Sequence, residues 1–373
     1  MKQTAIVLTT INRPHLLRGY AENIIRYGHA DGVQILMVAD RKTPSAAAED
    51  IKEVERSGVQ AQLLDLEWQD QWLGRFPALS RMIPFDSDNR RNVGFLVAAE
   101  RRAEVIITID DDNFIGDGDF VGLHGIVGDM IEAPVLRSLN RWVNICRYVE
   151  FDSGVPVYPR GFPFSRRWAD TSEGSSGTGR VMLNAGLWLD DPDVDAVTRL
   201  VLRTRGIRIH DGRWALGSGH FSPINTQNTA FHRDVLPAYY YVKMGASIGG
   251  LKLDRYGDIW SGFFAKSVID HNNHMVTFGP PASVHRRNTH SLLKDLREEL
   301  WGMVLTDVLC EFVETLQLRS RGYGETYLEL ADHLRTFVGR RKDIPDAARD
   351  HIMEVADVMG IWVETCRVLG VTA

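Results

Sequence analysis

The chain has 373 residues, of which 44% are hydrophobic and 25% are charged, so its composition is that of a globular protein. The net charge of −6 argues against a nucleic-acid-binding surface, and no hydrophobic run is long enough to cross a bilayer. The three cysteines lack metal-binding spacing and no signal-peptide pattern precedes the first strand, so we expect a protein of the reducing cytoplasm.

The first third of the chain predicts strands that alternate with helices. Hydrophobic runs at 4–10, 33–39, 59–66 and 105–109 predict buried strands, and the segments 13–25, 46–56 and 95–102 predict helices. This order is typical of an α/β fold with a mostly parallel sheet covered by helices. Ligands of such sheets bind at the carboxyl ends of the strands. We therefore expect Thr9, Asn12 and Asp40 to contact a nucleotide.

The segment 105–114, Val-Ile-Ile-Thr-Ile-Asp-Asp-Asp-Asn-Phe, is central to the functional prediction. A buried strand runs straight into three carboxylates, which repel each other unless a cation lies among them. Alternate side chains of an extended segment share a face, so Asp110 and Asp112 can bind one Mg²⁺ or Mn²⁺ that also holds a diphosphate. The alternative is an acidic turn that caps the next helix. Neither GxGxxG nor GxxxxGK[ST] occurs, so no dinucleotide fingerprint or P-loop is expected.

Two further polar segments supply candidate binding residues. Arg90 and Arg91 precede a helix and can reach a phosphate or a sugar hydroxyl, or simply lie in solvent at the helix start. Asn225, Gln227 and Asn228 precede a strand and can donate to sugar hydroxyls.

Two more candidates lie later in the chain. Asp258 precedes an aromatic helix, where it faces a sugar or only complements the helix dipole. His285 ends a strand that begins near Met275, and it is either a third metal ligand beside Asp110 and Asp112 or a structural histidine.

Two segments around these candidates have ambiguous roles. The Gly/Ser-rich stretch 171–179 predicts a flexible loop, which is either a lid over the site or a tolerated surface insertion. The carboxylates at 190–195 follow the predicted strand 181–189, and we expect most of them to be solvated or to cap a helix at 196–203.

From about residue 290 the pattern changes to long amphipathic helices. Hydrophobic residues recur at helical spacing on one face and predict a core stripe or a dimer interface: Ile352, Val355, Met359, Trp362 and Cys366. We therefore predict a nucleotide-sugar-binding catalytic domain at 1–289 and a helical region at 290–373, with a possible homodimer through the helices.

Several segments, taken in order, resemble one family. They are 109–112, 160–165, 186–196, 228–234 and 255–262, and they resemble the reversibly glycosylated polypeptides, whose plant members are UDP-arabinopyranose mutases. The resemblance implies a GT-A-like (Rossmann-like) fold with a mixed, mostly parallel sheet and a C-terminal helical appendage. It also implies UDP-sugar binding through Asp110, Asp111 and Asp112 with a divalent cation, and reversible glycosylation of Arg160.

The chain departs from the family pattern on the sugar side. Phe162 replaces a tyrosine, Asn184-Ala185 replaces Ser-His, and the stretch 172–179 is an insertion. We therefore expect a Mn²⁺- or Mg²⁺-dependent enzyme that transfers the glycosyl group of a nucleoside-diphosphate sugar, with UDP preferred. The acceptor is a small molecule, a lipid, a glycan or the protein itself, and Asp258 orients or deprotonates it. The alternatives are a mutase acting through Arg160 and a non-catalytic scaffold that binds the nucleotide sugar.

Overall fold

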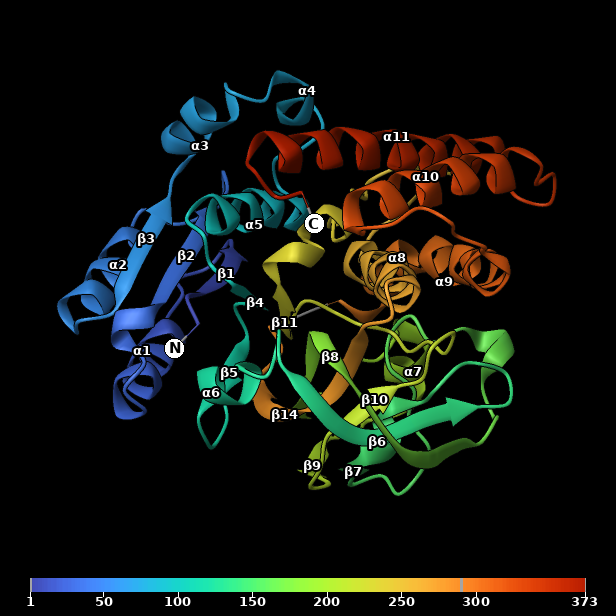
Figure 1. The fold of residues 1–373 in the computed structure, drawn as a ribbon, viewed down its shortest axis with the longest axis horizontal. Helices are drawn as coiled ribbons and strands as arrows, with labels where there is room; N and C mark the ends of the chain where they lie inside the picture. The colour runs from blue at the N-terminus through green and yellow to red at the C-terminus, as the bar shows by residue number, and fades with distance from the viewer. Residues whose placement is uncertain (1, 289–290, 373) are drawn as a thin grey trace.

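The computed structural model describes residues 2–288 and 291–372. Its first half is a parallel sheet in the order β3 (Gln60–Leu64), β2 (Val33–Ala39), β1 (Thr4–Thr10) and β4 (Val105–Ile109). The helices α1 (Leu17–Arg26), α2 (Ala47–Arg56) and α5 (Arg91–Glu100) flank these strands (Figure 1). The predicted strands and helices of this half are confirmed, with ends shifted by a few residues.

Both faces of this sheet are buried, which explains why its strands do not alternate polar and apolar residues. In β1, Ile6 and Leu8 pack in one hydrophobic cluster with α1 and α2, whereas Ala5 and Val7 pack in the other with α5. Helix α5 packs very closely on the sheet at Gly94. A Cβ at this position would collide with Val7, so the close approach requires glycine.

The second half of the sheet begins with β11 (Asn228–His232), which is antiparallel to β4. The order continues through β8 (Thr171–Asp190), β6 (Met130–Ser138), β10 (Trp214–Leu216), β14 (Met275–His285) and β5 (Asn113–Ile115). Short strands β7 (Val149–Phe151) and β9 (Gly206–Ile209) pair at the side, and β12 (Ser247–Ile248) pairs with β13 (Leu251–Lys252) in a separate hairpin. The mixed sheet, parallel in its N-terminal part and flanked by helices, confirms the predicted α/β arrangement.

The prediction of a flexible loop at 171–179 is wrong. These residues form the first half of β8, and they pair antiparallel with β6 from Ser138 to Ile131. Backbone hydrogen bonds to β6 outweigh the low strand propensity of glycine and serine. The segment is part of the sheet and is therefore not a lid.

Four short helices complete the first two thirds of the chain: α3 (Leu66–Leu73), α4 (Pro77–Ser80), α6 (Phe120–His124) and α7 (Ala196–Val201). Only α7 was predicted, and Asp195 caps it by accepting a hydrogen bond from the Thr198 N–H. The capping role expected for the carboxylates at 190–195 is thus confirmed for Asp195.

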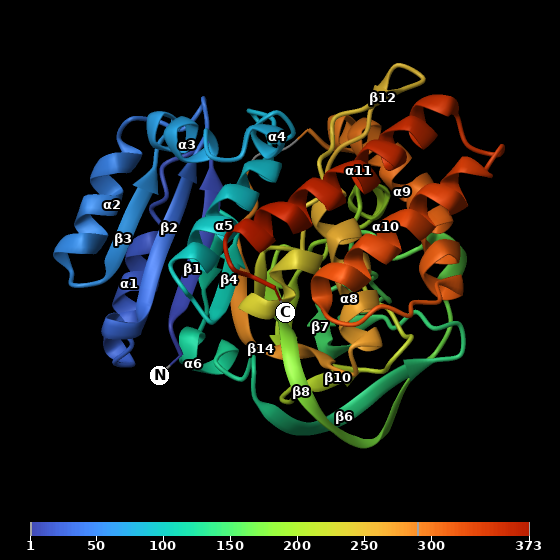
Figure 2. The same cartoon turned by 45° about the horizontal axis from the view of Figure 1, so that its top comes forward.

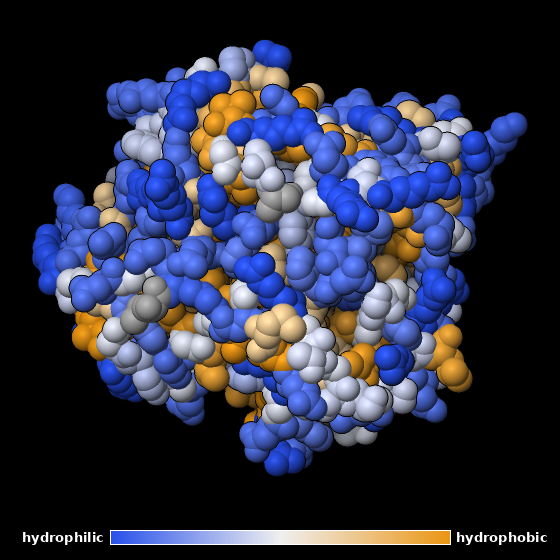
Figure 3. All heavy atoms as spheres, viewed as in Figure 1, coloured by the Kyte–Doolittle hydropathy of each residue, from blue (hydrophilic) through white to orange (hydrophobic). Residues whose placement is uncertain are grey.

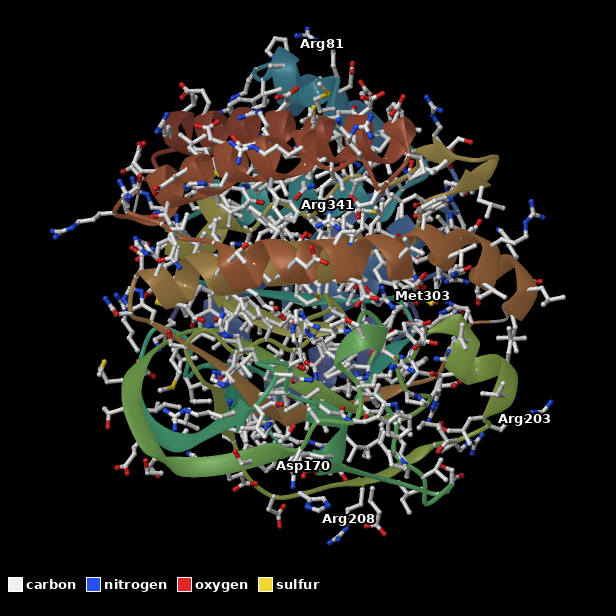
Figure 4. The ribbon with its side chains drawn as sticks, turned by 90° about the vertical axis from the view of Figure 1, so that its right-hand side faces the viewer. Arg81, Asp170, Arg203, Arg208, Met303 and Arg341 are labelled. Atoms are coloured by element: carbon white, nitrogen blue, oxygen red, sulfur yellow. The ribbon has the colours of Figure 1, made fainter. Side chains whose placement is uncertain are left out.

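Four long helices lie on one side of the sheet: α8 (Gly257–His271), α9 (Leu292–Thr315), α10 (Tyr323–Gly339) and α11 (Asp346–Val368). Figure 4 shows α10 and α11 on the outside and α9 between them and the strands. The predicted stripe from Ile352 to Cys366 is buried against these neighbours, so it is core. The predicted boundary at 289/290 lies outside the described residues.

The view in Figure 3 shows a face covered mainly by hydrophilic residues, with hydrophobic ones in small separate groups. None of the helices in the described ranges combines the length and the apolar character needed to span a bilayer.

Candidate functional site

A cavity of about 700 Å³ lies at the carboxyl ends of β1, β2 and β4. The structure brings nine of the predicted site residues to its wall: Thr9, Asn12, Asp40, Asp110, Asp111, Asp112, Arg160, Asp258 and His285. Two predicted residues, Arg90 and Asn228, do not line it. The parallel strands thus gather their polar ends at one edge, as expected for an open α/β sheet.

The three consecutive carboxylates have different partners. Asp110 accepts a 2.6 Å hydrogen bond from Arg91, and Asp111 accepts hydrogen bonds from Thr10 Oγ1 at 2.5 Å and Asn12 Nδ2 at 3.0 Å. Burial raises the pKa of Asp110 to about 6, although Arg91 opposes this shift. Asp112 lies on the other side, toward His285.

His285 faces the triplet with one ring nitrogen. Its Nε2 lies 3.3 Å from Asp112 Oδ2, and its Nδ1 lies 2.7 Å from the carbonyl oxygen of Asp191. Burial raises the pKa of Asp112, but hydrogen bonds from His285 and from the backbone N–H of Asn288 outweigh burial and hold it below its ordinary value. The Asp191 carbonyl accepts the Nδ1–H, so Nε2 is the ring nitrogen that faces Asp112. Burial lowers the pKa of His285, but Asp112 outweighs burial and holds it above its ordinary value, because the protonated ring donates to this carboxylate.

The donor types in this corner suit a hard divalent cation. Asp110 and Asp112 offer carboxylate oxygens, and His285 offers one imidazole nitrogen. The mutual repulsion of the two carboxylates contributes to the raised pKa of Asp110, and a cation between them would relieve it. Within residues 2–288 and 291–372, however, no group of three such side chains is already assembled at ligating distance.

Of the two adjacent arginines, Arg91 faces the cavity and Arg90 does not. The Arg91 guanidinium is buried and donates to Thr108 Oγ1 and to Asp110. Arg90 points to the opposite side of the helix start, where its Nε donates to Gln69 Oε1 at 3.0 Å. Consecutive helical residues differ by about 100° in direction, so only one of the pair can face the site.

Arg160 lies at the floor of the cavity between two carboxylates. Its Nε and Nη2 donate to Asp193 at 2.8 and 3.1 Å, and its Nη1 and Nη2 donate to Asp258 at 3.1 and 2.8 Å. Burial lowers the pKa of Arg160, but the two carboxylates outweigh burial and hold it well above its ordinary value. Gly161 has φ +81°, and a Cβ there would collide with Ile259. The absence of a side chain at Gly161 therefore lets the Arg160 segment lie against α8.

Asp193 is the site residue that the sequence reasoning missed. It was grouped with the solvated carboxylates of 190–195, yet it is only 5% exposed. Besides Arg160, it accepts a 2.8 Å hydrogen bond from Asn225 Nδ2. Burial raises the pKa of Asp193, but Arg160 and Asn225 hold it below its ordinary value. The Pro192-Asp193 pair within the matched segment 186–196 was the available signal.

Asn228 faces the interior behind the cavity wall. Its Nδ2 donates to the carbonyl oxygen of Pro281 at 2.9 Å, and its Oδ1 lies 2.9 Å from His124 Nε2. Its neighbour Gln227 lines the cavity instead. Adjacent residues of an extended segment point to opposite sides, so one of the two had to be internal.

Basic side chains form the outer wall of the cavity. Arg199 donates to Asp191 at 2.9 Å, Arg287 donates to Asp295 at 2.8 Å, and Lys294 lies on the same wall. Together with Lys42 on the opposite side, these cations can accompany a phosphate-bearing ligand.

The amino-acid sequence matches a family model: residues 69–370 match that of the reversibly glycosylated polypeptides. The probable UDP-arabinopyranose mutase 4 of Arabidopsis thaliana is 28% identical over 286 residues, covering 76% of this chain and 72% of that protein. The UDP-arabinopyranose mutase 1 of Oryza sativa subsp. japonica is 27% identical over 290 residues, with the same coverage of 76% and 72%.

A solved structure of glucosyl-3-phosphoglycerate synthase from Mycobacterium tuberculosis, in complex with Mn²⁺ and UDP-glucose, aligns with 82% of this chain and 78% of that one. Its TM-score is 0.41 and its sequence identity is 12%. A structural similarity this low is not evidence for the reaction or the ligands of this chain.

Proposed function

We propose that this chain, which belongs to the reversibly glycosylated polypeptide family, is an enzyme that transfers the glycosyl group of a nucleoside-diphosphate sugar. UDP is the preferred nucleotide, and the acceptor is a small molecule, a lipid, a glycan or the protein itself. The observation that carries the proposal is the carboxylate triplet at the end of β4. It lies in one cavity with Asp40, Arg160 and His285.

The nucleotide half of the cavity is formed by the ends of the parallel strands. We assign Thr9, Asn12 and Asp40 to the base and ribose, because these side chains lie at the ends of β1 and β2 beside the triplet. Asp111 orients Thr10 and Asn12 through the hydrogen bonds that it accepts from them.

Asp110, Asp112 and His285 would hold the Mn²⁺ or Mg²⁺. A divalent ion at this position supplies Lewis-acid stabilisation of the diphosphate leaving group. Arg91 keeps the Asp110 carboxylate oriented, and Arg199, Arg287 and Lys294 add positive charge on the outer wall.

A second candidate function is a UDP-sugar mutase in which Arg160 takes up the sugar reversibly. The names of the plant relatives favour it. Bond formation at a guanidinium nitrogen requires a lone pair, so Arg160 must first lose a proton. Asp193 and Asp258 both contact it and are the groups that can receive this proton. In the transferase, Arg160 instead stays charged and Asp258 faces the sugar.

The cellular location and the oligomeric state remain predictions. The cytoplasmic location rests on the cysteine pattern. A homodimer through the C-terminal helices would need a surface other than the stripe from Ile352 to Cys366, because that stripe is buried within the chain.

The test is an incubation of the purified chain with radiolabelled UDP-sugars and Mn²⁺, without acceptor. Label that stays on the denatured protein, is released by excess UDP and is absent in Arg160→Lys would establish the mutase chemistry. Metal-dependent release of UDP without label on the protein would establish transfer, with water as the acceptor. If no sugar gives either result and UDP binding does not depend on metal, the proposal is wrong.

A further inference from the structure

A second cavity of about 600 Å³ lies next to the first. Its walls come from the loop 84–88, the segment 241–246, the hairpin of β12 and β13, and helix α11. Figure 2 shows the hairpin beside α11. The two cavities share six residues: Asp86, Ser87, Asp88, Tyr241, Arg255 and Glu298. A molecule in the second cavity therefore has direct access to the first.

Two buried polar side chains on this wall have unused hydrogen-bonding capacity. Tyr241 lines both cavities, and among the described residues none hydrogen-bonds to its hydroxyl, which is open to the cavity. His351 of α11 is 5% exposed, and its Nε2 has no partner among the same residues. Buried polar groups are nearly always paired in native proteins. The unpaired His351 Nε2 therefore indicates a polar ligand, and the Tyr241 hydroxyl can contact the same ligand.

The charges of the second cavity identify the kind of ligand. Its basic side chains are all engaged by carboxylates: Lys243 by Glu354 at 2.7 Å, Lys252 by Asp254, and Arg255 by Glu299 at 2.8 Å. The side chain of Asp88 has no hydrogen bond or ion pair within the described ranges, so its carboxylate is available at the junction of the cavities. This surface repels anions, and it offers acceptors and donors to hydroxyl groups.

We propose that the second cavity binds the acceptor of the transfer reaction, a neutral molecule rich in hydroxyl groups such as a sugar or a polyol. Asp88 accepts the proton of the attacking hydroxyl. The acceptor oxygen then forms a bond to the anomeric carbon, the bond between that carbon and the diphosphate oxygen breaks, and the nucleoside diphosphate leaves with the bonding electrons. This inference rests on the proposed function, and it assigns the C-terminal helix α11 a part in substrate binding.

The experiment uses the full chain with Mn²⁺ and UDP bound, and two probes of the same shape, glucose and glucuronate. Saturation-transfer NMR measures the binding of each probe. Ala246→Trp fills the second cavity, because Ala246 lines only that cavity. Ser247→Trp, on the exposed side of the hairpin, is the matched control. Calorimetric titration with UDP on every variant tests the nucleotide site separately.

We expect glucose to bind the wild-type chain and Ser247→Trp, and its signal to fall at least fivefold in Ala246→Trp. Glucuronate should bind at least fivefold more weakly than glucose, because Asp86, Asp88 and Glu298 repel it. Asp88→Asn should retain glucose binding but, when a UDP-sugar replaces UDP as the donor, lose glucose-dependent release of UDP. The inference is overturned if Ala246→Trp and Ser247→Trp bind glucose equally, if glucuronate binds as well as glucose, or if no glucose signal is seen. A failure of UDP binding in the wild-type chain would instead refute the proposed function.

Discussion

His285 Nε2 lies 3.3 Å from Asp112 Oδ2, although His285 ends β14 and Asp112 lies far earlier in the sequence, in the turn between β4 and β5. The contact follows from the sheet, because β14 ends at His285 and pairs antiparallel with β5 just after the triplet. His285 is only 3% exposed. A buried imidazole with one nitrogen fixed and the other directed at a carboxylate is arranged as a metal ligand is.

His285→Gln should therefore weaken the binding of Mn²⁺ in the presence of UDP by about tenfold or more. Electron paramagnetic resonance of free Mn²⁺ measures this affinity. His333→Gln, on the exposed face of α10, is the control and should leave it unchanged. Equal Mn²⁺ affinity in the two variants would show that His285 is structural.

The arginine between Asp193 and Asp258 should be important for stability. Arg160→Met leaves two buried carboxylates close together without a counter-charge, so we expect it to lower the free energy of unfolding by about 3–5 kcal/mol. Urea denaturation measures this loss. The triple variant Arg160→Met, Asp193→Asn, Asp258→Asn removes both charges and should recover most of it. A loss below about 1 kcal/mol in the single variant, the range of an exposed pair, would contradict the observed burial.

Much of this site could be predicted, because the ends of the buried strands can be located in the sequence. Long buried runs fix where β1, β2, β4 and β14 end, and the polar residues at or just after these ends line the cavity. What could not be predicted is which neighbour of a pair faces inward. Arg91 rather than Arg90, and Gln227 rather than Asn228, line the cavity because of the phase of a helix or a strand, which tertiary packing decides.

The strand at 171–179 could not be predicted for a different reason. Its glycines and serines carry no apolar pattern, and the segment is held by backbone pairing with β6, which local sequence does not reveal. Asp193 was missed because acidic residues near a turn are usually solvated. Its partner Arg160 lies on a separate segment of the chain.

Helix α9, in the predicted helical region 290–373, packs against the predicted catalytic domain 1–289, and this contact can be tested. A Cβ at Gly302 would collide with the ring of Tyr256, which is 1% exposed just before α8. Gly302→Ala should therefore lower the free energy of unfolding by about 1–3 kcal/mol. Gly360→Ala on α11 is the matched control, because its nearest neighbour would lie at 3.9 Å, and it should be neutral or stabilise by up to about 1 kcal/mol. Thermal unfolding distinguishes them, and equal effects would contradict the close packing of α9.

The buried His124 should make stability depend on pH. Its Nε2 lies 2.9 Å from Asn228 Oδ1 and its Nδ1 lies 3.0 Å from Asn184 Nδ2, an arrangement that satisfies the neutral ring. Burial lowers the pKa of His124 to about 3. The unfolded chain thus binds the proton more tightly, and the folded state loses stability as the pH falls below the ordinary histidine pKa of about 6.5.

Between pH 8 and pH 5 this group should lower the free energy of unfolding by about 2 kcal/mol. Urea denaturation at the two pH values measures the difference. In His124→Gln the difference should shrink by that amount, whereas His333→Gln should behave like the wild-type chain. An unchanged pH dependence in His124→Gln would show that the ring is protonated in the folded state.

The central claim is that the triplet at the end of β4 binds a nucleoside diphosphate through a divalent cation. Calorimetric titration of the full chain with UDP, in Mn²⁺ and then in EDTA, tests it most directly. We expect binding in Mn²⁺ that is lost in EDTA and weakened at least tenfold in Asp112→Asn. UDP binding of equal strength in EDTA, or unchanged binding in Asp112→Asn, would contradict it.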